Sequence, residues 1–533
     1  MKKLGQHLII ATIFSLSTTL PTTLWAKIFI YCSEGSPSSF NPQITTDGTS
    51  NNASTHTVYN RLVKFKYGTT EIVPSLASSW KISPDGKSYT FKLRRGVKFH
   101  TTKYFKPTRE FNGQDVLFSI NRQRVKKHPY HHIGGGNYEY FNGMEMGKLI
   151  KNVISVDDYT VKITLHNPES PFLANLAMGF MSILSAEYAT NLQKKGEMEQ
   201  IDTHPIGTGP FVFRRYVKDT LIRYRSNKSY FEGQPKLDKL IFSITPDASV
   251  RYQKLKTKEC HLITEPAPAD LKGMMAQSSY IKLMSAPGLN VGYLAMNVQK
   301  KPLNRRMVRQ AIGHALNRES YIKAIYLGNA MVAKNPLPPT IWSYNDKIRP
   351  RSYNLQKAKE LLKKAGYPNG FNISLWTLPV SRPYNPNGKK MGEMIQADLA
   401  KIGIKVKLVS YDWPTYLAKS RKGEHQMIQL GWTGDNGDPD NFLYLLGCAG
   451  VLAGSNVAKW CDKKFDRLLT KAKRLSDRKK RIPLYHQAQE IFRRESPWIP
   501  IAHSKIFRAM LTNVDGYKID PLGGDIFTYV DLK

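Results

Sequence analysis

Hydrophobic and polar residues alternate with a period of two in the first part of the chain. Tyr89–Leu93 and Tyr159–Leu165 show this alternation clearly, and turn residues precede each run. Such a period is typical of strands with one buried face. Between the two runs, Asn112 opens a segment with the features of a helix start. The pattern predicts a small, strand-rich α+β insertion over residues 61–165.

After residue 300, apolar residues recur at helical spacing instead. Leu355–Ala365 is one apolar stripe and Gly366 follows it; Met391–Ile402 is another, which ends at Gly403 before the strand-like run Ile404–Leu408. Glycines at these places are typical helix ends. Repeated helix–stop–strand units build a sheet that helices cover. We therefore predict an α/β domain in this part of the chain.

The first 26 residues have a third pattern. Lys2 and Lys3 precede an apolar stretch from Leu8 to Leu20, and Leu24-Trp25-Ala26 is a candidate cleavage site. This order is typical of a secretory signal. The apolar stretch is too short to cross a bilayer, which argues against an uncleaved anchor. We expect residues 1–26 to be a signal peptide that is removed on export.

The chain is strongly basic. Its formal net charge is +38, and removal of Lys2 and Lys3 with the signal would leave +36. The cations are spread along the chain, and the densest run, Lys471–Arg481, has the pattern of a solvated helix face. The sequence contains no zinc finger, RNP motif or basic tail, so we expect no nucleic-acid partner. A general attraction for anionic ligands is an open alternative.

The four cysteines are Cys32, Cys260, Cys448 and Cys461. In an exported chain they suggest two disulfides, and three pairings are possible. A bond between Cys448 and Cys461 would close a short loop, worth roughly 3 kcal/mol in the chain-entropy model. Cys32 would then pair with Cys260. Four buried thiols are the alternative.

The stretch Gly431–Asn441 is the most informative polar segment, with three carboxylates, three glycines and a proline. It follows the strand-like run Met427–Leu430, which puts Asp435 on a loop leaving a strand, where binding residues concentrate. Asp435 could take a ligand's ammonium, or the carboxylates could only cap their own turns. A calcium loop fits less well, because Leu446 stands where a bidentate Glu is required.

Three further polar segments allow two interpretations each. Arg382 lies on a proline-stiffened loop and could bind a carboxylate as a fork or be a surface charge. The segment Thr45–Ser50 could contact a ligand or cap a helix. The cluster of His128, His131 and His132 lacks the spacing of a metal site, and we interpret it as a surface loop rather than a metal or haem site.

The sequence also lacks the patterns of catalysis. It contains neither GxSxG nor HExxH, and no arrangement of cysteine and histidine suggests a nucleophile. We predict that the protein is not an enzyme.

Six motifs occur together in one order along the chain. They are Tyr31–Pro37, Pro205–Phe211, Ser243–Tyr252, Gly288–Tyr293, Arg382–Pro386 and Gly431–Asn441. From about residue 27 to residue 533, the chain resembles the periplasmic dipeptide-binding proteins of bacterial ABC transporters. These belong to an extracellular solute-binding family that also includes binders of oligopeptides, nickel, haem and glutathione. The high positive charge and the histidine-rich loop depart from the family's pattern.

The resemblance implies an α/β, two-lobed periplasmic binding protein with a hinge and an extra α+β domain inserted in the first lobe. Lobe I would comprise residues 27–60, 200–285 and 505–533, the insertion residues 61–199, and lobe II residues 286–504. The lobes would close over the ligand by a hinge motion.

The implied function is periplasmic capture of dipeptides for an inner-membrane ABC permease, by a monomer without a cofactor. Binding of haem or glutathione for uptake is the alternative. Whether a chemoreceptor also recognises the closed form is left open.

The resemblance also assigns ligand-binding residues. Asp435 would bind the peptide's α-ammonium and Arg382 its α-carboxylate, so that two fixed charges measure the peptide's length. Each contact is on the order of 4 kcal/mol before desolvation, at an effective dielectric constant near 20. The other ligand-binding residues expected from it are Trp432, Thr433, Gly434, Tyr384, Thr46 and Gly48.

Overall fold

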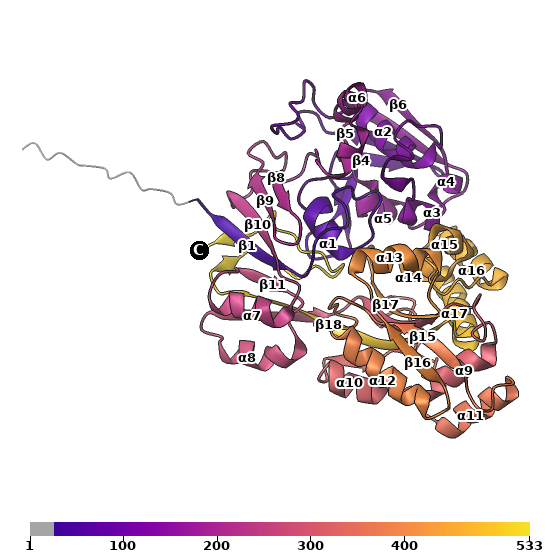
Figure 1. The fold of residues 1–533 in the computed structure, drawn as a ribbon. Coiled ribbons are helices and arrows are strands. Elements are labelled where there is room, and N and C mark those ends of the chain that lie inside the picture. The colour runs from indigo at the N-terminus through magenta and orange to yellow at the C-terminus, as the bar shows by residue number, and fades with distance from the viewer. Residues whose placement is uncertain (1–25) are drawn as a thin grey trace, which may run out of the picture.

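The computed structural model describes residues 26–533. The predicted signal peptide, residues 1–26, therefore lies outside the described residues except for Ala26. Figure 1 shows a molecule with two lobes and a further domain packed beside them.

A twelve-stranded sheet runs through both lobes. Along its main path the strand order is β16-β15-β17-β13-β18-β11-β1-β10-β9-β8, and β12 and β14 pair with β18 outside this path. The strands are β1 (Ile28–Ser33), β8 (Phe211–Val217), β9 (Leu221–Ser226), β10 (Lys239–Ile244), β11 (Leu262–Thr264), β12 (Ile281–Pro287), β13 (Asn290–Met296), β14 (Ala330–Val332), β15 (Asn372–Trp376), β16 (Lys405–Val409), β17 (Met427–Thr433) and β18 (Trp498–Leu511).

The long strand β18 belongs to both lobes. Its first part pairs with β13, where Ile499 lies opposite Leu294, and its last part pairs with β11 and β12, where Ala509 lies opposite Leu283. We call the part with β1 and β8–β12 lobe I, and the part with β13–β17 lobe II. The pairing changes between Pro287 and Asn290 on one chain segment and near residues 502–505 on the other.

These two connecting segments are hydrogen-bonded to each other. The amide N–H of Gly288 donates to the carbonyl of Ser504 over 3.1 Å, and the side chain of Asn290 donates to the same carbonyl over 3.1 Å. A Cβ on residue 288 would collide with that carbonyl, which explains the glycine. Two short adjacent segments are the usual form of a hinge. The lobe bounds predicted from the sequence stay a prediction.

Lobe II has the predicted helix–strand alternation. The helices α9 (Arg306–Ala315), α10 (Arg318–Ile325), α11 (Leu355–Lys364) and α12 (Gly388–Ala400) pack around its sheet (Figure 1). Asn387 caps α12 by accepting a hydrogen bond from the amide of Lys390 over 3.0 Å. Ile395 and Leu399, from the predicted stripe, are fully buried. The stripe is therefore core, as its spacing predicts.

The inserted domain also has the predicted elements. Its sheet has the order β4-β5-β7-β6, with β4 (Ala77–Ile82), β5 (Ser88–Leu93), β6 (Ile150–Asp157) and β7 (Thr160–Leu165), beside the hairpin β2 (Val63–Phe65) and β3 (Ile72–Pro74). Helix α2 (Gly113–Arg124) begins after Asn112 with a capping box that includes Asp115. The two alternating runs are thus neighbouring strands, and the helix starts at the predicted residue.

The remaining elements are shorter or lie outside the sheets. The helices are α1 (Gly48–Ser50), α3 (Glu139–Gly143), α4 (Met146–Leu149), α5 (Phe172–Leu176), α6 (Ala186–Lys195), α7 (Ala248–Lys256), α8 (Leu271–Ala276), α13 (Trp413–Lys422), α14 (Asp440–Leu443), α15 (Cys448–Ala453), α16 (Lys463–Lys473) and α17 (Arg478–Glu495). The fold is completed by the short π-helix η1 (Asn51–Thr55), the 3-10 helices η2 (Ile133–Gly135), η3 (Gly179–Met181), η4 (Met198–Asp202), η5 (Pro268–Asp270) and η6 (Tyr444–Leu446), and the strands β19 (Val514–Asp515) and β20 (Asp531–Leu532).

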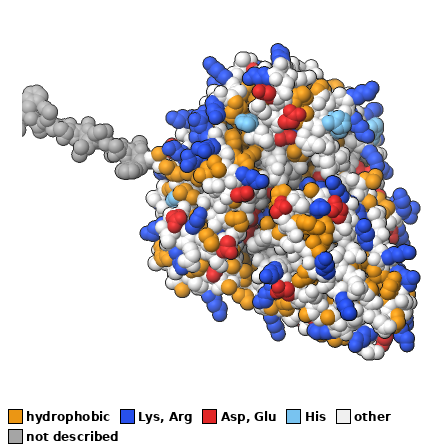
Figure 2. All heavy atoms as spheres, in the orientation of Figure 1, with side chains coloured by type: hydrophobic (Ala, Val, Ile, Leu, Met, Phe, Trp, Pro, Cys, Tyr) orange, Lys and Arg blue, Asp and Glu red, His pale blue; other side chains and the backbone are white. Residues whose placement is uncertain are grey.

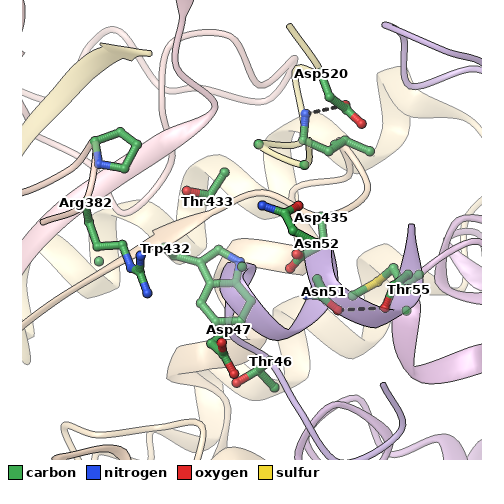
Figure 3. Close-up of a pocket in the computed structure, with 18 of the residues that line it drawn as sticks. Thr46, Asp47, Asn51, Asn52, Thr55, Arg382, Trp432, Thr433, Asp435 and Asp520 are labelled. Atoms are coloured by element: carbon green, nitrogen blue, oxygen red, sulfur yellow. Dashed lines mark hydrogen bonds between the residues drawn. The ribbon is translucent and has the colours of Figure 1, made fainter. Parts of the chain in front are cut away.

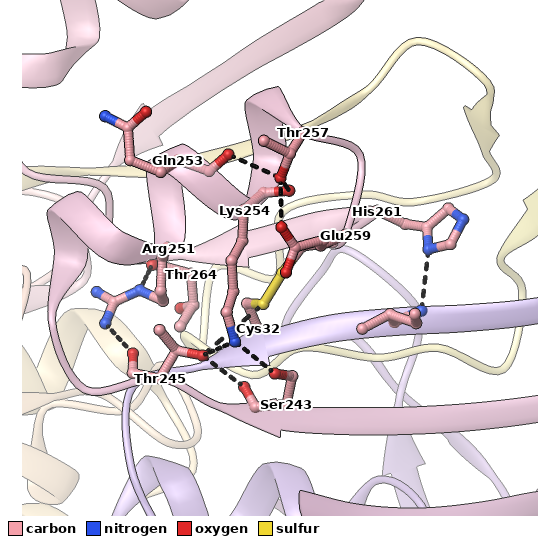
Figure 4. Close-up of a disulfide and its surroundings, with 12 residues drawn as sticks. Cys32, Ser243, Thr245, Arg251, Gln253, Lys254, Thr257, Glu259, His261 and Thr264 are labelled. Atoms are coloured by element: carbon pink, nitrogen blue, oxygen red, sulfur yellow. Dashed lines mark hydrogen bonds between the residues drawn. A yellow bond between two sulfur atoms is a disulfide. The ribbon is translucent and has the colours of Figure 1, made fainter. Parts of the chain in front are cut away.

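Both disulfides join the cysteines that the short-loop pairing requires. Cys32 on β1 is bonded to Cys260, with 5.9 Å between their Cα atoms, and Cys448 to Cys461, with 4.6 Å. Figure 4 shows the first bond beside Lys254, whose ammonium donates to the hydroxyls of neighbouring residues of lobe I. The second bond closes 13 residues that follow the Asp-rich loop. The predicted pairing is confirmed.

The basic run has a different structure from the one predicted. It spans the end of α16, a turn and the start of α17, rather than one helix. Lys471 and Lys479 are exposed, but Lys473 and Arg481 turn inward to carboxylates at 3.6 and 2.8 Å. Elsewhere the cations are scattered, as Figure 2 shows for one face of the molecule. On this face the positive charge is spread over the surface rather than gathered in one patch.

Candidate functional site

A cavity of about 220 Å³ lies where lobe I, lobe II and the inserted domain meet. Its wall combines segments far apart in the chain: Thr46–Gly48 and Asn51–Asn52 of lobe I, Glu139–Tyr140 of the insertion, and Arg382–Tyr384 and Leu430–Thr433 of lobe II. In the view of Figure 3, Trp432 lies between Arg382 and Asp435. The cavity is large enough and polar enough to bind a small charged molecule.

Seven of the eight residues predicted to bind a ligand line this cavity. Gly434 is the exception. Its amide donates to the carbonyl of Leu289 over 2.7 Å, and a Cβ there would lie 2.7 Å from carbon atoms of Leu289 and Phe442. Packing behind the loop explains a glycine at this position, and a role of Gly434 in ligand binding stays a prediction.

Asp435 lies just after β17 and opens into the cavity. One carboxylate oxygen accepts the hydroxyl of Tyr140 over 2.9 Å and the side-chain amide of Asn441 over 3.3 Å. Burial raises the pKa of Asp435 to about 7, although these hydrogen bonds act in the opposite direction. Among residues 26–533, no Lys, Arg or His forms an ion pair with Asp435. A shielded carboxylate without a cation favours a cationic ligand.

The other carboxylates of this loop are used differently. Asp438 forms two hydrogen bonds of 2.8 Å with the guanidinium of Arg481 and accepts the amide of Asp440 over 3.0 Å. Asp440 is buried, and burial raises its pKa. Each of the two interpretations of this loop thus applies to a different residue: Asp438 stabilises the turn, and Asp435 faces the cavity.

Arg382 is buried rather than on the surface. Its Nη1 donates to Glu34 Oε1 over 2.7 Å, and its guanidinium carbon lies 5.1 Å from the ring centre of Trp413. Its backbone closes a tight turn with Asn385 through bonds of 3.2 and 3.0 Å. Burial alone would lower the pKa of Arg382, but the charges of Glu34, Asp47 and Glu265 act together in the opposite direction, so the pKa is raised. The residue therefore stays a fixed cation at the cavity wall.

The hydroxyl-rich loop combines both of its predicted roles. Asp47 caps α1 by accepting the amide of Ser50 over 2.9 Å, while Thr46, Asp47 and Gly48 line the cavity. Capping orders the loop, and this order positions the cavity wall.

The three clustered histidines lie away from the cavity wall. His131 Nδ1 is 2.9 Å from the carbonyl of Arg122, and His132 is exposed. A different histidine, His56, lines the cavity, and burial with the nearby charge of Arg61 lowers its pKa to about 3. No group of three or more His, Cys, Asp or Glu suited to a metal occurs among the described residues.

Several cavity residues escaped prediction from the sequence. Tyr140 reaches Asp435 from the inserted domain, and Glu34, Glu265 and Arg508 lie near Arg382 from lobe I. Glu34 lies inside the first motif and could have been found there. The other three have no local signal, because their position depends on how distant segments pack. In the described part of the chain, we also find no helix with the length and hydrophobicity of a membrane span.

Comparison with known proteins shows close relatives. Residues 71–451 match the model of the family described as bacterial extracellular solute-binding proteins, family 5 middle. The chain is 51% identical to the dipeptide-binding protein of Escherichia coli K12, over 100% of this chain and 98% of that protein. It is 49% identical to heme-binding protein A of Haemophilus influenzae, over 95% and 92% of the two chains.

Solved structures similar to this chain include peptide-binding proteins of the same fold. The dipeptide binding protein from Pseudoalteromonas sp. SM9913 in complex with Met-Leu matches with a TM-score of 0.93 and 41% identity, over 95% of this chain and 100% of that one. A periplasmic binding protein of Helicobacter pylori in complex with the peptide STSA matches with a TM-score of 0.91 and 43% identity, over 95% and 98%. The fold is that of the two-lobed periplasmic binding proteins, as predicted.

Proposed function

Because the chain belongs to family 5 of the bacterial extracellular solute-binding proteins, we propose that it captures dipeptides in the cavity between its lobes. The bound peptide is then delivered to an ABC permease of the inner membrane. In this proposal the protein acts in the periplasm after removal of its signal peptide, as a monomer and without catalysis. A chemoreceptor that recognises the closed form would be a further partner.

The observation that carries the proposal is the state of Asp435. Its carboxylate is half-buried, opens into the cavity and has no ion-pair partner among residues 26–533. A peptide's α-ammonium would supply the missing cation through a charge-assisted hydrogen bond, a contact worth about 1.5–3 kcal/mol.

Arg382 would hold the other end of the peptide. Only Glu34 and Thr49 accept hydrogen bonds from its guanidinium among the described residues, over 2.7 and 3.4 Å. A guanidinium has five N–H donors, so donors remain for a carboxylate. Since both contacts use groups that every dipeptide has, the side chains of the peptide can vary.

The comparisons support this function. The relative solved with Met-Leu shares the fold over nearly the whole chain, and relatives at about half identity carry the name dipeptide-binding protein. Trp432, Thr433, Tyr384, Thr46 and Gly48 would line the sides of the bound peptide.

Calorimetry with three peptides tests the proposal. We expect Ala-Ala to bind at least about tenfold more tightly than N-acetyl-Ala-Ala or Ala-Ala-amide, since each modification removes one charged end. Asp435→Asn and Arg382→Ala should weaken Ala-Ala binding similarly. Asp412→Asn is the matched control, because Asp412 is an exposed residue of lobe II that caps a helix and Asn can also cap one. Equal affinities for the three peptides would contradict the two-charge model.

Haem binding is the second candidate, because the relative from Haemophilus influenzae carries the name heme-binding protein A. A haem titration followed at the Soret band tests it, with His131 and His132 each replaced by Ala and with His56→Ala as the variant inside the cavity. A saturable spectrum that one of these variants removes would favour haem over dipeptides. Glutathione, the remaining alternative, can be titrated by the same calorimetry.

A further inference from the structure

Carboxylates of the protein lie at the Arg382 end of the cavity, where the peptide's own carboxylate is expected to bind. Glu34 and Glu265 line the wall there together with Arg382 and Arg508. Arg508 donates to Glu265 Oε1 over 3.1 Å and to Asp525 Oδ1 over 2.7 Å. The two guanidiniums are thus already paired within the protein.

Glu34 has one oxygen without a partner. Its Oε1 accepts hydrogen bonds from Arg382 over 2.7 Å and from Thr49 over 3.1 Å. Its Oε2 is buried and has no hydrogen-bond partner among the described residues, while the side chain of Glu34 is only 7% exposed. A buried carboxylate oxygen without a donor costs free energy, and a ligand that supplies a donor there would recover it.

Glu265 is the second carboxylate at this end. It follows β11 with a backbone φ of +47°, a left-handed conformation that a glutamate seldom adopts. Burial raises its pKa to about 7, Arg508 acts in the opposite direction, and the charge of Glu34 raises it further. Such unusual backbone geometry at a cavity wall is a feature of functional positions.

The sum of charges at this end is negative. The charged residues that line this end are the cations Arg382 and Arg508 and the anions Glu34, Asp47 and Glu265. Glu34 is paired with Arg382, and Glu265 with Arg508. With all five groups ionised the sum is −1, and a peptide carboxylate bound at Arg382 would make it −2; because burial raises the pKa of Glu265 to about 7, its share of this charge is partial at neutral pH and full at higher pH. The surroundings of the peptide's second residue would therefore favour a positive charge.

From this arrangement we infer that the cavity prefers dipeptides whose second residue has a cationic side chain, lysine or arginine, directed to Glu34 Oε2 and Glu265. The inference rests on the proposed function, because it requires the peptide's carboxylate to lie at Arg382. At the Asp435 end, the hydrogen-bond partners of Asp435 are the uncharged Tyr140 and Asn441, and the nearby Glu139 of the cavity wall is paired with Arg421 over 2.7 Å. A cation on the first residue gains less there.

Calorimetry with matched peptides tests the inference. Norleucine has the length of lysine without its charge, so we compare Ala-Lys with Ala-norleucine and Lys-Ala with norleucine-Ala. Ala-Lys is expected to bind at least about tenfold more tightly than Ala-norleucine, as for a charge-assisted hydrogen bond. The corresponding ratio for Lys-Ala is expected to be clearly smaller.

Two variants locate the effect. Glu265→Gln and Glu34→Gln should each lower the ratio of the Ala-Lys and Ala-norleucine affinities, and the double variant should bring it close to one. Glu259→Gln, the same change at an exposed residue of the same lobe, should keep the ratio of the unmodified protein. Because each ratio is taken within one variant, a general change in lobe closure cancels.

The outcomes separate this inference from the proposed function. If Ala-Ala does not bind, the proposed function fails and the inference with it. If Ala-Ala binds and needs both charged ends, but Ala-Lys has no advantage over Ala-norleucine, only the inference is overturned. It is also overturned if Lys-Ala gains as much as Ala-Lys, or if the double variant keeps the full ratio.

Discussion

Peptide binding should depend on pH through Asp435. Burial raises the pKa of this carboxyl to about 7, and only its ionised form would attract an ammonium. In the complex, the ammonium would lower the pKa again, so binding would release a proton wherever the free protein holds one. The affinity for a dipeptide should therefore fall as the pH falls below 7.

The size of the effect follows from the pKa. With a pKa of about 7 in the free protein, the apparent dissociation constant scales as one plus ten raised to the difference between pKa and pH. Between pH 7 and pH 5 it should rise about 50-fold, which is about tenfold per unit once the pH is well below the pKa. Above pH 8 the affinity should fall again, because the α-amino group of a peptide loses its proton near pH 7.7–8.0.

Other titrating groups must be separated from Asp435. Tyr140 and Tyr444 face it, but burial raises both of their pKa values well above 10, so they stay neutral in this range. Glu265 titrates near pH 7 at the other end of the cavity. Its protonation would strengthen binding of a carboxylate, which is the opposite trend. The contribution of Asp435 is therefore the difference between the profiles of the unmodified protein and Asp435→Asn.

The assay is calorimetry of Ala-Ala binding from pH 5 to pH 8.5, repeated in buffers of different ionisation enthalpy. At pH 7 the unmodified protein should release about half a proton more per peptide than Asp435→Asn does. Asp412→Asn should reproduce the unmodified profile. Parallel profiles for the unmodified protein and Asp435→Asn would refute the role of Asp435 as the ammonium ligand.

Three further predictions concern stability. The pKa of Asp435 in the folded protein lies above its ordinary value of 3.8, so ionisation of Asp435 destabilises the fold; this cost is complete above pH 7 and absent below pH 3.8. Asp435→Asn should therefore stabilise the protein at pH 8, by at most about 4 kcal/mol. We expect a higher melting temperature for this variant at pH 8 and an unchanged one at pH 4. Replacing both Cys448 and Cys461 by Ser should lower the free energy of unfolding in denaturant by roughly 2–3 kcal/mol. Gly434→Ala should lower it by about 1–3 kcal/mol by crowding Leu289 and Phe442, whereas an unchanged midpoint would show that the loop relaxes.

The sequence predicts well wherever a local pattern determines the structure. The stripes over residues 355–365 and 391–402 become α11 and α12, because helical spacing selects one buried face whatever lies opposite. The alternating runs become β5 and β7 for the corresponding reason in strands. The four cysteines leave three pairings open, and the structure has the one that joins Cys448 to Cys461, which are 13 residues apart in the chain.

The same reasoning fails for contacts between distant segments. Tyr140 and Asp435 are 295 residues apart, and Glu34 and Arg382 are 348 apart. Such pairs form only when the lobes and the inserted domain pack together, and the local hydrophobic periodicity does not predict this packing. Gly434 is a related case: it packs against Leu289 behind the loop, and the residues next to it in the chain do not indicate this contact.

The two charges expected to hold a peptide, Asp435 and Arg382, both belong to lobe II, and each has a hydrogen-bond partner from another part of the molecule. The hydroxyl of Tyr140, from the inserted domain, donates to Asp435, and Arg382 donates to Glu34 of lobe I. Each charge thus already has a partner from across the cavity: a neutral hydroxyl at one end and a carboxylate at the other. A peptide would add an ammonium beside the hydroxyl with little competition, but its carboxylate would have to share Arg382 with Glu34. Binding at the ammonium end should therefore be the less selective step. The carboxyl end, where Glu34 and Glu265 compete with or complement the ligand, is where differences between dipeptides should arise.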